Sequence, residues 1–317
     1  MRDRPLRLGT RRSPLALAQA EEARARLADA HALSESDIEL VSVTASGDRI
    51  QDRPLAEIGG KALWTKELDA WLLAGEIDFA VHSAKDVETL RPAGIAIAAI
   101  LPREDVRDVL VGADSIHALP QGARIGTSAP RRAAQLLHAR PDCSVVSFRG
   151  NVATRLAKLA AGEADATFLA AAGLNRLGER GTGHPLPAEE WLPAPGQGAI
   201  AIECRADDSA TRALLCAIDD PASHAAVQAE RALLAALGGN CHSPVAVLTL
   251  PDTAQPGGTG LHLRAALFSP DGAERTYGEA RFAAGDLNGP IRLAEDLLSR
   301  ASNSIAVHFT GPHSSPA

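Results

Sequence analysis

The fold is decided by residues 6–45, which read LRLGTRRSPLALAQAEEARARLADAHALSESDIELVSVTA. A short β-like run, LRLG, opens this stretch, an Ala- and Leu-rich segment follows over 14–30, and a second β-like run occupies 38–45. Such runs are typical of strands, and the Ala-rich segment is typical of a helix. Ser13 and Pro14 mark the helix start, because a serine oxygen caps backbone N–H groups and proline suits the first helical position. The order predicts a βαβ unit.

The same alternation continues to about residue 205, which predicts an α/β fold with mainly parallel sheet. Two sequence echoes occur within it. LGTRRSPLALAQ (8–19) pairs with IGTSAPRRAAQL (125–136), and LLAGEIDFAVHS (72–83) pairs with LAAGEADATFLA (159–170) in the same order. Each echo joins a strand to a helix start or a helix end. We therefore expect two duplicated lobes with a cleft between them, and Thr127-Ser128 is expected to cap the second helix as Ser13 caps the first.

A different pattern begins after Pro221. A helix over 222–237, strands near 244–250 and 261–268 and a closing helix over 290–301 predict a small α+β domain. The predicted domains are a first lobe (1–101 and 199–217), a second lobe (103–195) and a C-terminal domain (222–317).

Composition narrows the functional classes. Hydrophobic residues make up 45% and charged residues 22% of the 317 residues, which is typical of a globular protein rather than a disordered chain or a fibre. A net charge of -7 argues against a general nucleic-acid binder. No segment has the ~20 apolar residues of a membrane span, and the arginine-rich start lacks an apolar signal-peptide run. We expect a cytoplasmic protein that binds neither nucleic acid nor membrane.

The four cysteines are widely spaced, so we expect free thiols and no metal site. Cys143, Cys204 and Cys216 lie in runs that look buried. Cys241 lies in a Gly-rich turn, LGGNCHSP, where an accessible thiol can act as a nucleophile. From the residues alone, a structural cysteine is the better explanation of that turn.

Arginines mark the predicted strand-to-helix junctions. In open α/β sheets the strand ends form the binding crevice, and the forked guanidinium group binds carboxylates. Several arginines at one crevice therefore predict a ligand with several carboxylates, and no phosphate-binding glycine loop is present. The alternative is a set of solvated surface side chains. The arginines concerned are Arg11, Arg12, Arg131, Arg132, Arg149, Arg155 and Arg176.

Two further motifs lie beside these junctions. HSAKDV (82–87) follows an apolar strand and brings Lys85 and Asp86 to the same sheet edge, where an ionised carboxylate could stabilise a cation or move a proton. A surface ion pair is the alternative. In PAPGQGAIAIECR, Gly196 and Gly198 allow a close approach of backbone to ligand or a hinge, and a plain turn is equally consistent.

These motifs, in this order, resemble the porphobilinogen deaminase family, also called hydroxymethylbilane synthases. The resemblance covers nearly the whole chain. It implies two lobes similar in fold to periplasmic binding proteins and a third domain that holds a cofactor. Its motifs are RLGTRRSPLALAQA, GGKALWTKEL, HSAKDV, REDVRDVLV, GTSAPRR, FRGNVATRL, AAGLNRLG, LPAPGQGAIAIECR and the cysteine turn.

The resemblance implies a transferase of tetrapyrrole biosynthesis. It would join four porphobilinogen molecules, with release of ammonia, into the linear tetrapyrrole hydroxymethylbilane. The primer would be a dipyrromethane cofactor held by a thioether, which by position falls on Cys241, and Asp86 would be the catalytic carboxylate. The carboxylates of cofactor and substrate would be held by Arg11, Ser13, Lys61, Lys85, Thr127, Ser128, Arg131, Arg132, Arg149, Arg155 and Arg176.

The resemblance also implies hinges near 100–104 and 195–200, a monomer, and handover of the product to uroporphyrinogen-III synthase. The chain departs from the family pattern at Glu57, Trp64, Ala84, Ala129 and Asn240. Asn240 replaces a glycine, and asparagine tolerates left-handed backbone. Two rival interpretations are a binding protein for a polycarboxylate and a pyridoxal-phosphate enzyme with Lys85 as its Schiff-base lysine.

Overall fold

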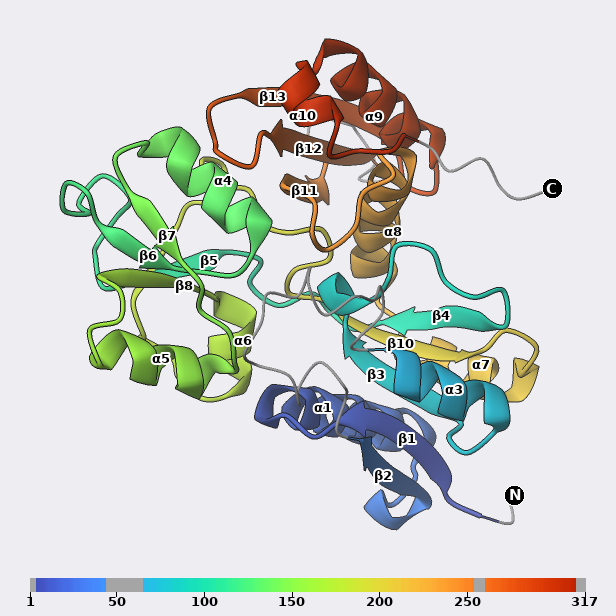
Figure 1. Cartoon of the computed structure of the whole chain (residues 1–317). Coiled ribbons are helices and arrows are strands. Elements are labelled where there is room, and N and C mark those ends of the chain that lie inside the picture. The colour runs from blue at the N-terminus through green and yellow to red at the C-terminus, as the bar shows by residue number, and fades with distance from the viewer. Residues whose placement is uncertain (1–3, 44–64, 254–259, 312–317) are drawn as a thin grey trace. The chain divides into compact units, whose positions relative to one another are not determined.

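The computed structural model describes residues 4–43, 65–253 and 260–311. Its contacts divide the chain into two compact units: Met1–Glu104 with Gly198–His224, and Asp105–Gln197 with Ala225–Ala317. The first unit has one sheet and the second has two (Figure 1). Each unit also has its own hydrophobic cores. Among the described residues, no helix has both the length and the apolar character needed to cross a membrane.

The first unit contains one five-stranded sheet in the order β2-β1-β3-β10-β4. β1 is parallel to β2 and β3, whereas β10 is antiparallel to β3 and β4. Its elements are β1 (Leu6–Arg11), α1 (Pro14–His31), η1 (Glu35–Asp37), β2 (Ile38–Val43), α3 (Lys66–Ala74), β3 (Phe79–Ser83), η2 (Ala84–Asp86), β4 (Ile95–Ile100), β10 (Ile200–Arg205) and α7 (Ser209–Cys216).

The second unit contains a five-stranded sheet in the order β7-β6-β8-β5-β9 and a three-stranded sheet in the order β11-β12-β13. The elements of the first are β5 (Asp108–Val111), β6 (Arg124–Gly126), α4 (Pro130–Ala139), β7 (Ser144–Val146), α5 (Val152–Ala160), β8 (Ala166–Ala170), α6 (Ala171–Arg176) and β9 (His184–Pro185). Those of the second are α8 (Pro221–Ala236), β11 (Val245–Pro251), β12 (Gly260–Phe268), β13 (Arg275–Ala283), α9 (Asn288–Arg300) and α10 (Asn303–Ala306).

The two five-stranded sheets share one topology, which confirms the predicted duplication. Each begins with three parallel strands, β2-β1-β3 or β7-β6-β8, followed by an antiparallel strand, β10 or β5. That antiparallel strand is the first one after the chain passes from one unit into the other. The expectation of mainly parallel sheet is therefore wrong, because half of the strand pairings in each sheet are antiparallel.

The second sequence echo extends to hydrogen bonds. In the first lobe the Asp78 carboxylate accepts from the backbone N–H of Arg7, and Asp78 N–H donates to the Arg7 carbonyl. In the second lobe Asp165 makes the same two bonds with Arg124. The repeated Gly-Glu-x-Asp sequence thus fixes the start of the neighbouring strand in the same way in both lobes.

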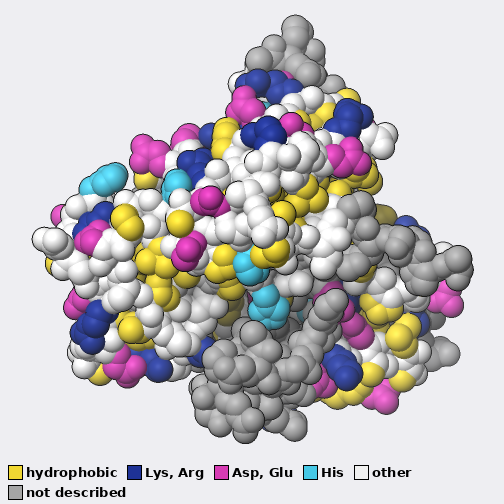
Figure 2. Space-filling model, turned by 45° about the horizontal axis from the view of Figure 1, so that its top comes forward, with side chains coloured by type: hydrophobic (Ala, Val, Ile, Leu, Met, Phe, Trp, Pro, Cys, Tyr) yellow, Lys and Arg dark blue, Asp and Glu magenta, His cyan; other side chains and the backbone are white. Residues whose placement is uncertain are grey.

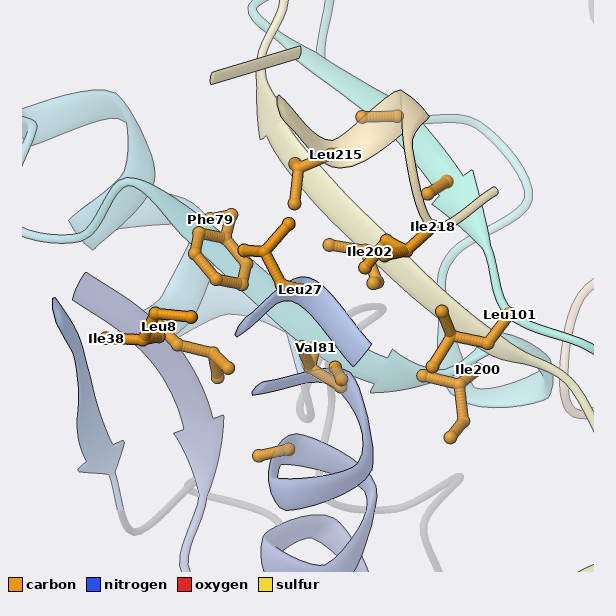
Figure 3. Close-up of a cluster of buried hydrophobic side chains, with 14 of the residues drawn as sticks. Leu8, Leu27, Ile38, Phe79, Val81, Leu101, Ile200, Ile202, Leu215 and Ile218 are labelled. Atoms are coloured by element: carbon orange, nitrogen blue, oxygen red, sulfur yellow. The ribbon is translucent and has the colours of Figure 1, made fainter. Parts of the chain in front are cut away.

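Apolar side chains cover both faces of the lobe sheets. In the first lobe, Leu27 of α1 and Leu215 of α7 pack with Phe79 and Ile202 on one face of the sheet (Figure 3). α3 covers the opposite face through Leu68. Burial of one such side chain contributes about 1.5–3 kcal/mol, so these faces supply much of the lobe's stability.

The C-terminal sheet also has two covered faces. α8 and α9 pack on one of them through residues such as Leu233 and Leu297. The other lies against α4 of the second lobe, where Ala134 contacts the cluster that contains Leu248 and Phe268. The C-terminal sheet and the second lobe therefore share a core within the second unit.

Candidate functional site

Arg11, Ser13 and Asp86 line one pocket of the first unit. β1 and β3 are adjacent parallel strands, so the residues at their carboxyl ends emerge at the same sheet edge. Arg11 is the last residue of β1, Ser13 caps α1 through its side-chain oxygen, and Asp86 ends the η2 turn that follows β3. The structure therefore brings these three predicted residues together, with Lys85 beside Asp86 in the same turn.

Backbone bonds hold the turn that carries Asp86. Ala84 N–H donates to the Ala199 carbonyl, and Val87 N–H donates to the Ala84 carbonyl. The Ser83 hydroxyl bonds the Gln19 side chain, which links the end of β3 to α1. The Ala84 methyl group is buried, so this departure from the family pattern leaves a small side chain beneath the turn.

A buried charged cluster that the sequence patterns did not predict lies next to this pocket. Arg91 donates to both Glu203 and Asp69, and Glu203 also lies near His82, which lines the pocket. Burial, with a further contribution from the charge of Arg91, lowers the pKa of His82 to about 4, so His82 is neutral at pH 7. The signal in the sequence was a single glutamate inside the apolar strand AIAIECR.

In the second unit, Thr127 and Ser128 lie at the start of α4, but neither caps it. Ser128 donates its hydroxyl to the Phe148 carbonyl, and Thr127 accepts from Ala129 N–H. Ala129 is the N-cap, and it offers no side-chain oxygen. The predicted Thr127-Ser128 cap is wrong, because the Ser128 hydroxyl is bound outside the helix.

Arg131 and Arg132 lie in the first turn of α4 and share the carboxylate of Asp108. Arg131 Nη2 donates to Asp108 Oδ2 at 2.8 Å and Arg132 Nη2 to Oδ1 at 2.7 Å. Trp191 Nε1 and Gln197 Nε2 donate to the same carboxylate at 2.9 and 2.8 Å. Burial acts to raise the pKa of Asp108, but the two guanidinium charges outweigh it and hold that pKa well below its usual range.

Both arginines are about 95% buried, because each is only 5% exposed. Their Nη1 atoms donate to the Leu192 and Phe168 carbonyls. In this structure the terminal nitrogens therefore bind protein groups rather than facing an open crevice. The Nε atoms of both have no hydrogen-bond partner among the described residues. Binding of ligand carboxylates by this pair stays a prediction.

The other three predicted arginines of the second unit are half-buried. Arg149 follows β7, Arg155 lies in α5 with Nε donating to the Gly150 carbonyl at 3.0 Å, and Arg176 ends α6. Lys61 lies outside the described residues, as does Glu57.

Cys241 is exposed in a turn after α8. Asn240 Oδ1 accepts from His242 N–H at 2.8 Å, and Asn240 N–H donates to Ser243 Oγ at 3.0 Å. The described residues with positive φ include no asparagine, so Asn240 is not in the left-handed conformation that its replacement of glycine suggested. It stabilises the turn through its side chain instead.

The other three cysteines were all expected to be buried, and the structure confirms this for two of them. Cys143 and Cys204 are buried as predicted, and burial raises the pKa of Cys204 to about 11. Cys216 is exposed at the end of α7, so its predicted burial is wrong. Cys216 and Cys241 are thus both accessible thiols.

Gly196 and Gly198 flank the point where the chain leaves the second unit. Both have positive φ, at 71° and 85°. Gly196 N–H donates to Glu230 Oε2 at 2.7 Å, and a Cβ on Gly198 would lie 2.4 Å from the Glu104 carbonyl oxygen. The close approach at Gly198 requires glycine.

Surface charge is mixed. Figure 2 shows Lys and Arg side chains interspersed with Asp and Glu over the visible face. Across residues 4–43, 65–253 and 260–311, no group of three or more His, Cys, Asp or Glu is arranged to hold a metal ion.

Comparison with known proteins gives one family. Residues 6–213 match the family model "Porphobilinogen deaminase, dipyromethane cofactor binding domain", and residues 224–302 match "Porphobilinogen deaminase, C-terminal domain". A porphobilinogen deaminase of Sphingopyxis alaskensis is 58% identical over 308 residues, 96% of each chain. One of Nitrobacter winogradskyi is 49% identical over 311 residues, again 96% of each chain.

Among solved structures, the BvgS VFT2 domain of Bordetella pertussis is similar at 18% identity and a TM-score of 0.40, covering 68% of this chain and 86% of that chain. The family matches, in contrast, cover most of the sequence. The chain belongs to the porphobilinogen deaminase family, transferases that polymerise porphobilinogen in tetrapyrrole biosynthesis and bind a dipyrromethane cofactor.

Proposed function

We propose that Asp86 is the catalytic carboxylate of porphobilinogen polymerisation and that Cys241 holds the dipyrromethane cofactor. The observation that carries the first assignment is the pocket where Asp86 meets Arg11 and Ser13. A carboxylate next to a cation and a hydroxyl suits a substrate that presents both carboxylates and an N–H group.

Each residue of the pocket has a chemical role. Arg11 and Ser13 bind a side-chain carboxylate of the substrate and so fix the pyrrole. Asp86 accepts a hydrogen bond from the pyrrole N–H and stabilises the positive charge that develops as ammonia leaves. The carboxylate can then take up the proton released when the new carbon–carbon bond forms. Lys85, in the same turn, adds a second cation for substrate carboxylates.

The chain fits the cofactor at two places. Cys241 presents an exposed thiol, as a thioether requires, whereas Cys143 and Cys204 are buried. The orphaned Nε atoms of Arg131 and Arg132 are buried donors suited to carboxylates. When bound, dipyrromethane supplies the pyrrole carbon on which the chain of four units is built.

Further residues complete the proposal. Lobe movement as the product grows would use the glycine pair Gly196 and Gly198 and the segment 100–104. We also propose a cytoplasmic monomer that hands hydroxymethylbilane to uroporphyrinogen-III synthase. The remaining carboxylate-binding residues would be Lys61, Thr127, Ser128, Arg149, Arg155 and Arg176.

The attachment is tested by intact mass of the denatured protein and peptide mapping. We expect a covalent increment of one dipyrrole on the peptide with Cys241, and its loss in Cys241→Ser. Cys216→Ser is the matched control, because Cys216 is the other exposed thiol of the described residues. A dipyrrole that persists in Cys241→Ser would overturn the assignment, and its loss in Cys216→Ser would move it to Cys216.

A further inference from the structure

A buried ion cluster lies behind the turn that carries Asp86. Arg91 Nε and Nη2 donate to the two oxygens of Glu203, both at 2.8 Å. The same guanidinium donates to Asp69, with distances of 2.5 Å from Nη2 and 3.1 Å from Nη1. The Glu203 side chain is 0% exposed and that of Arg91 is 8% exposed, so water competes little for these bonds. We call Asp69, Arg91 and Glu203 the clamp.

The clamp joins three separate elements of the first lobe. Asp69 lies in the first turn of α3, Glu203 lies on β10, and Arg91 lies in the irregular segment between η2 and β4. The pairing of β10 with β4 shifts register between Ile202 and Glu203. Such an irregularity redirects a side chain, and here it falls at the anchoring carboxylate.

Both ends of the segment that carries Asp86 are held on β10. At one end Arg91 is bound to Glu203 in a forked arrangement. At the other end His82 belongs to β3 and pairs with Ala201 of β10, and it lines the pocket beside Asp86; its neutral ring lies near Glu203 without a hydrogen bond. Residues 82–91 therefore form a loop whose two ends are held on the same strand, one by strand pairing and the other by the buried Glu203 carboxylate, with Lys85 and Asp86 near its middle.

We propose that Arg91 and Glu203 are positioning residues for Asp86. They touch no reacting group; they hold the Arg91 end of the segment 82–91 on α3 and β10, so that the Asp86 carboxylate keeps its place in the pocket with Arg11 and Ser13. The inference rests on the proposed catalytic role of Asp86. Irregular backbone alone would leave this carboxylate less precisely placed, and misplacement by about 1 Å can cost about 100-fold in rate.

The test uses two conservative variants of the full-length, cofactor-loaded enzyme. Deleting the Arg91 charge would leave two buried carboxylates unpaired and endanger folding. Arg91→Lys keeps the charge but lacks the planar fork. Glu203→Gln keeps the size, loses one of the two bonds to Arg91, and leaves Asp69 to neutralise the guanidinium. Folding is checked by thermal melting, and loading by intact mass.

The expected signature is a split between kcat and KM. In both variants kcat per loaded enzyme should fall about 10- to 100-fold. KM for porphobilinogen should stay within about twofold, because the proposed substrate-binding residues Arg11 and Ser13 belong to β1 and the cap of α1 rather than to the segment 82–91.

Arg205→Lys is the matched control. Arg205 ends β10 and donates to the Leu72 and Ile77 carbonyls at 3.0 Å each, so it also ties this strand to neighbouring elements, but not to the segment 82–91. We expect it to lower the melting temperature and leave kcat unchanged. Asp86→Ala is measured alongside, because its failure to abolish turnover would refute the proposed function itself.

The outcomes distinguish the positioning role of the clamp from the proposed catalytic role of Asp86. If Asp86→Ala is inactive and both clamp variants keep normal kcat with lowered melting temperatures, the clamp is structural and the inference is wrong. Equal losses of kcat in Arg205→Lys would likewise refute it. If Arg91→Lys does not fold, Glu203→Gln decides alone.

Discussion

Asp108→Asn should be the most damaging conservative change in the second lobe. The wild-type carboxylate is 0% exposed and accepts from Arg131, Arg132, Trp191 and Gln197. An amide keeps the size of the side chain but has one acceptor oxygen, and its NH2 group would face donors. Two buried guanidinium groups would then lack a counter-ion.

The size of the expected stability loss follows from the burial of Asp108 and its two arginines. Removing one partner of a buried ion pair costs about 3–5 kcal/mol, since the remaining charge stays desolvated. A domain has only about 5–15 kcal/mol of stability in total. The variant should therefore lose a large share of the second unit's stability, and Asp108 should do more for that unit than any exposed ion pair.

The assay is urea unfolding of wild type and variant from pH 7 down to pH 3. The folded-state pKa of Asp108 lies below its ordinary value of 3.8, so its contribution is present above that pH. It is lost as the pH falls toward the folded-state pKa, because the unfolded chain then binds the proton first. The difference in free energy of unfolding between wild type and Asp108→Asn should therefore be greatest at pH 7 and begin to shrink below about pH 4.

Asp142→Asn is the control. Asp142 accepts two bonds from Arg140, and its pKa is also lowered, chiefly by those hydrogen bonds, but its side chain is 33% exposed. Water can replace the lost partner there, so Asp142→Asn should lower the free energy of unfolding far less than Asp108→Asn does. If Asp108→Asn lowers the free energy of unfolding by less than about 1 kcal/mol, or by no more than the control does, the argument from burial is refuted.

Two further predictions concern the site. Asp86→Ala should fold with nearly unchanged stability and lose turnover, measured as porphobilinogen consumption; near-normal activity would refute the catalytic assignment. Asn240→Gly should lower the free energy of unfolding by about 1 kcal/mol, because it removes the acceptor of His242 N–H and loosens the turn around Cys241. Unchanged urea unfolding would show that the side-chain bond contributes nothing there.

Much of the fold could be predicted from local patterns. Ser13-Pro14 begins α1 as expected, and the two sequence echoes correspond to equivalent strands and helices. Strand direction could not be predicted, because an apolar run such as that of β10 is the same in either direction. β13 was missed since only scattered positions of it are buried, so its sequence lacks a strong apolar pattern.

Tertiary contacts account for the errors at the site. Arg11, Ser13 and Asp86 meet as predicted, because the ends of adjacent parallel strands share one edge. The local sequence predicts that Ser128 caps α4, but its hydroxyl donates to the Phe148 carbonyl, which is distant in sequence. Burial of Arg131 and Arg132 could not be foreseen without Asp108, a carboxylate that the sequence showed only as one charge beside an apolar strand.

Asp108 and Glu203 lie on equivalent strands of the two lobes, at different positions along them: Asp108 opens β5 opposite Ala170, whereas Glu203 lies within β10 opposite Ala80. Each lies on the antiparallel strand that follows a passage between units, β5 or β10, and each is 0% exposed and bound to arginine within its own lobe. Buried ion pairs contribute little net stability, but they penalise arrangements that leave a charge unpaired. A slip of one residue would turn either carboxylate to the opposite face of its sheet. The paired charges therefore add a penalty against a register slip in the two strands that the chain delivers from the other unit.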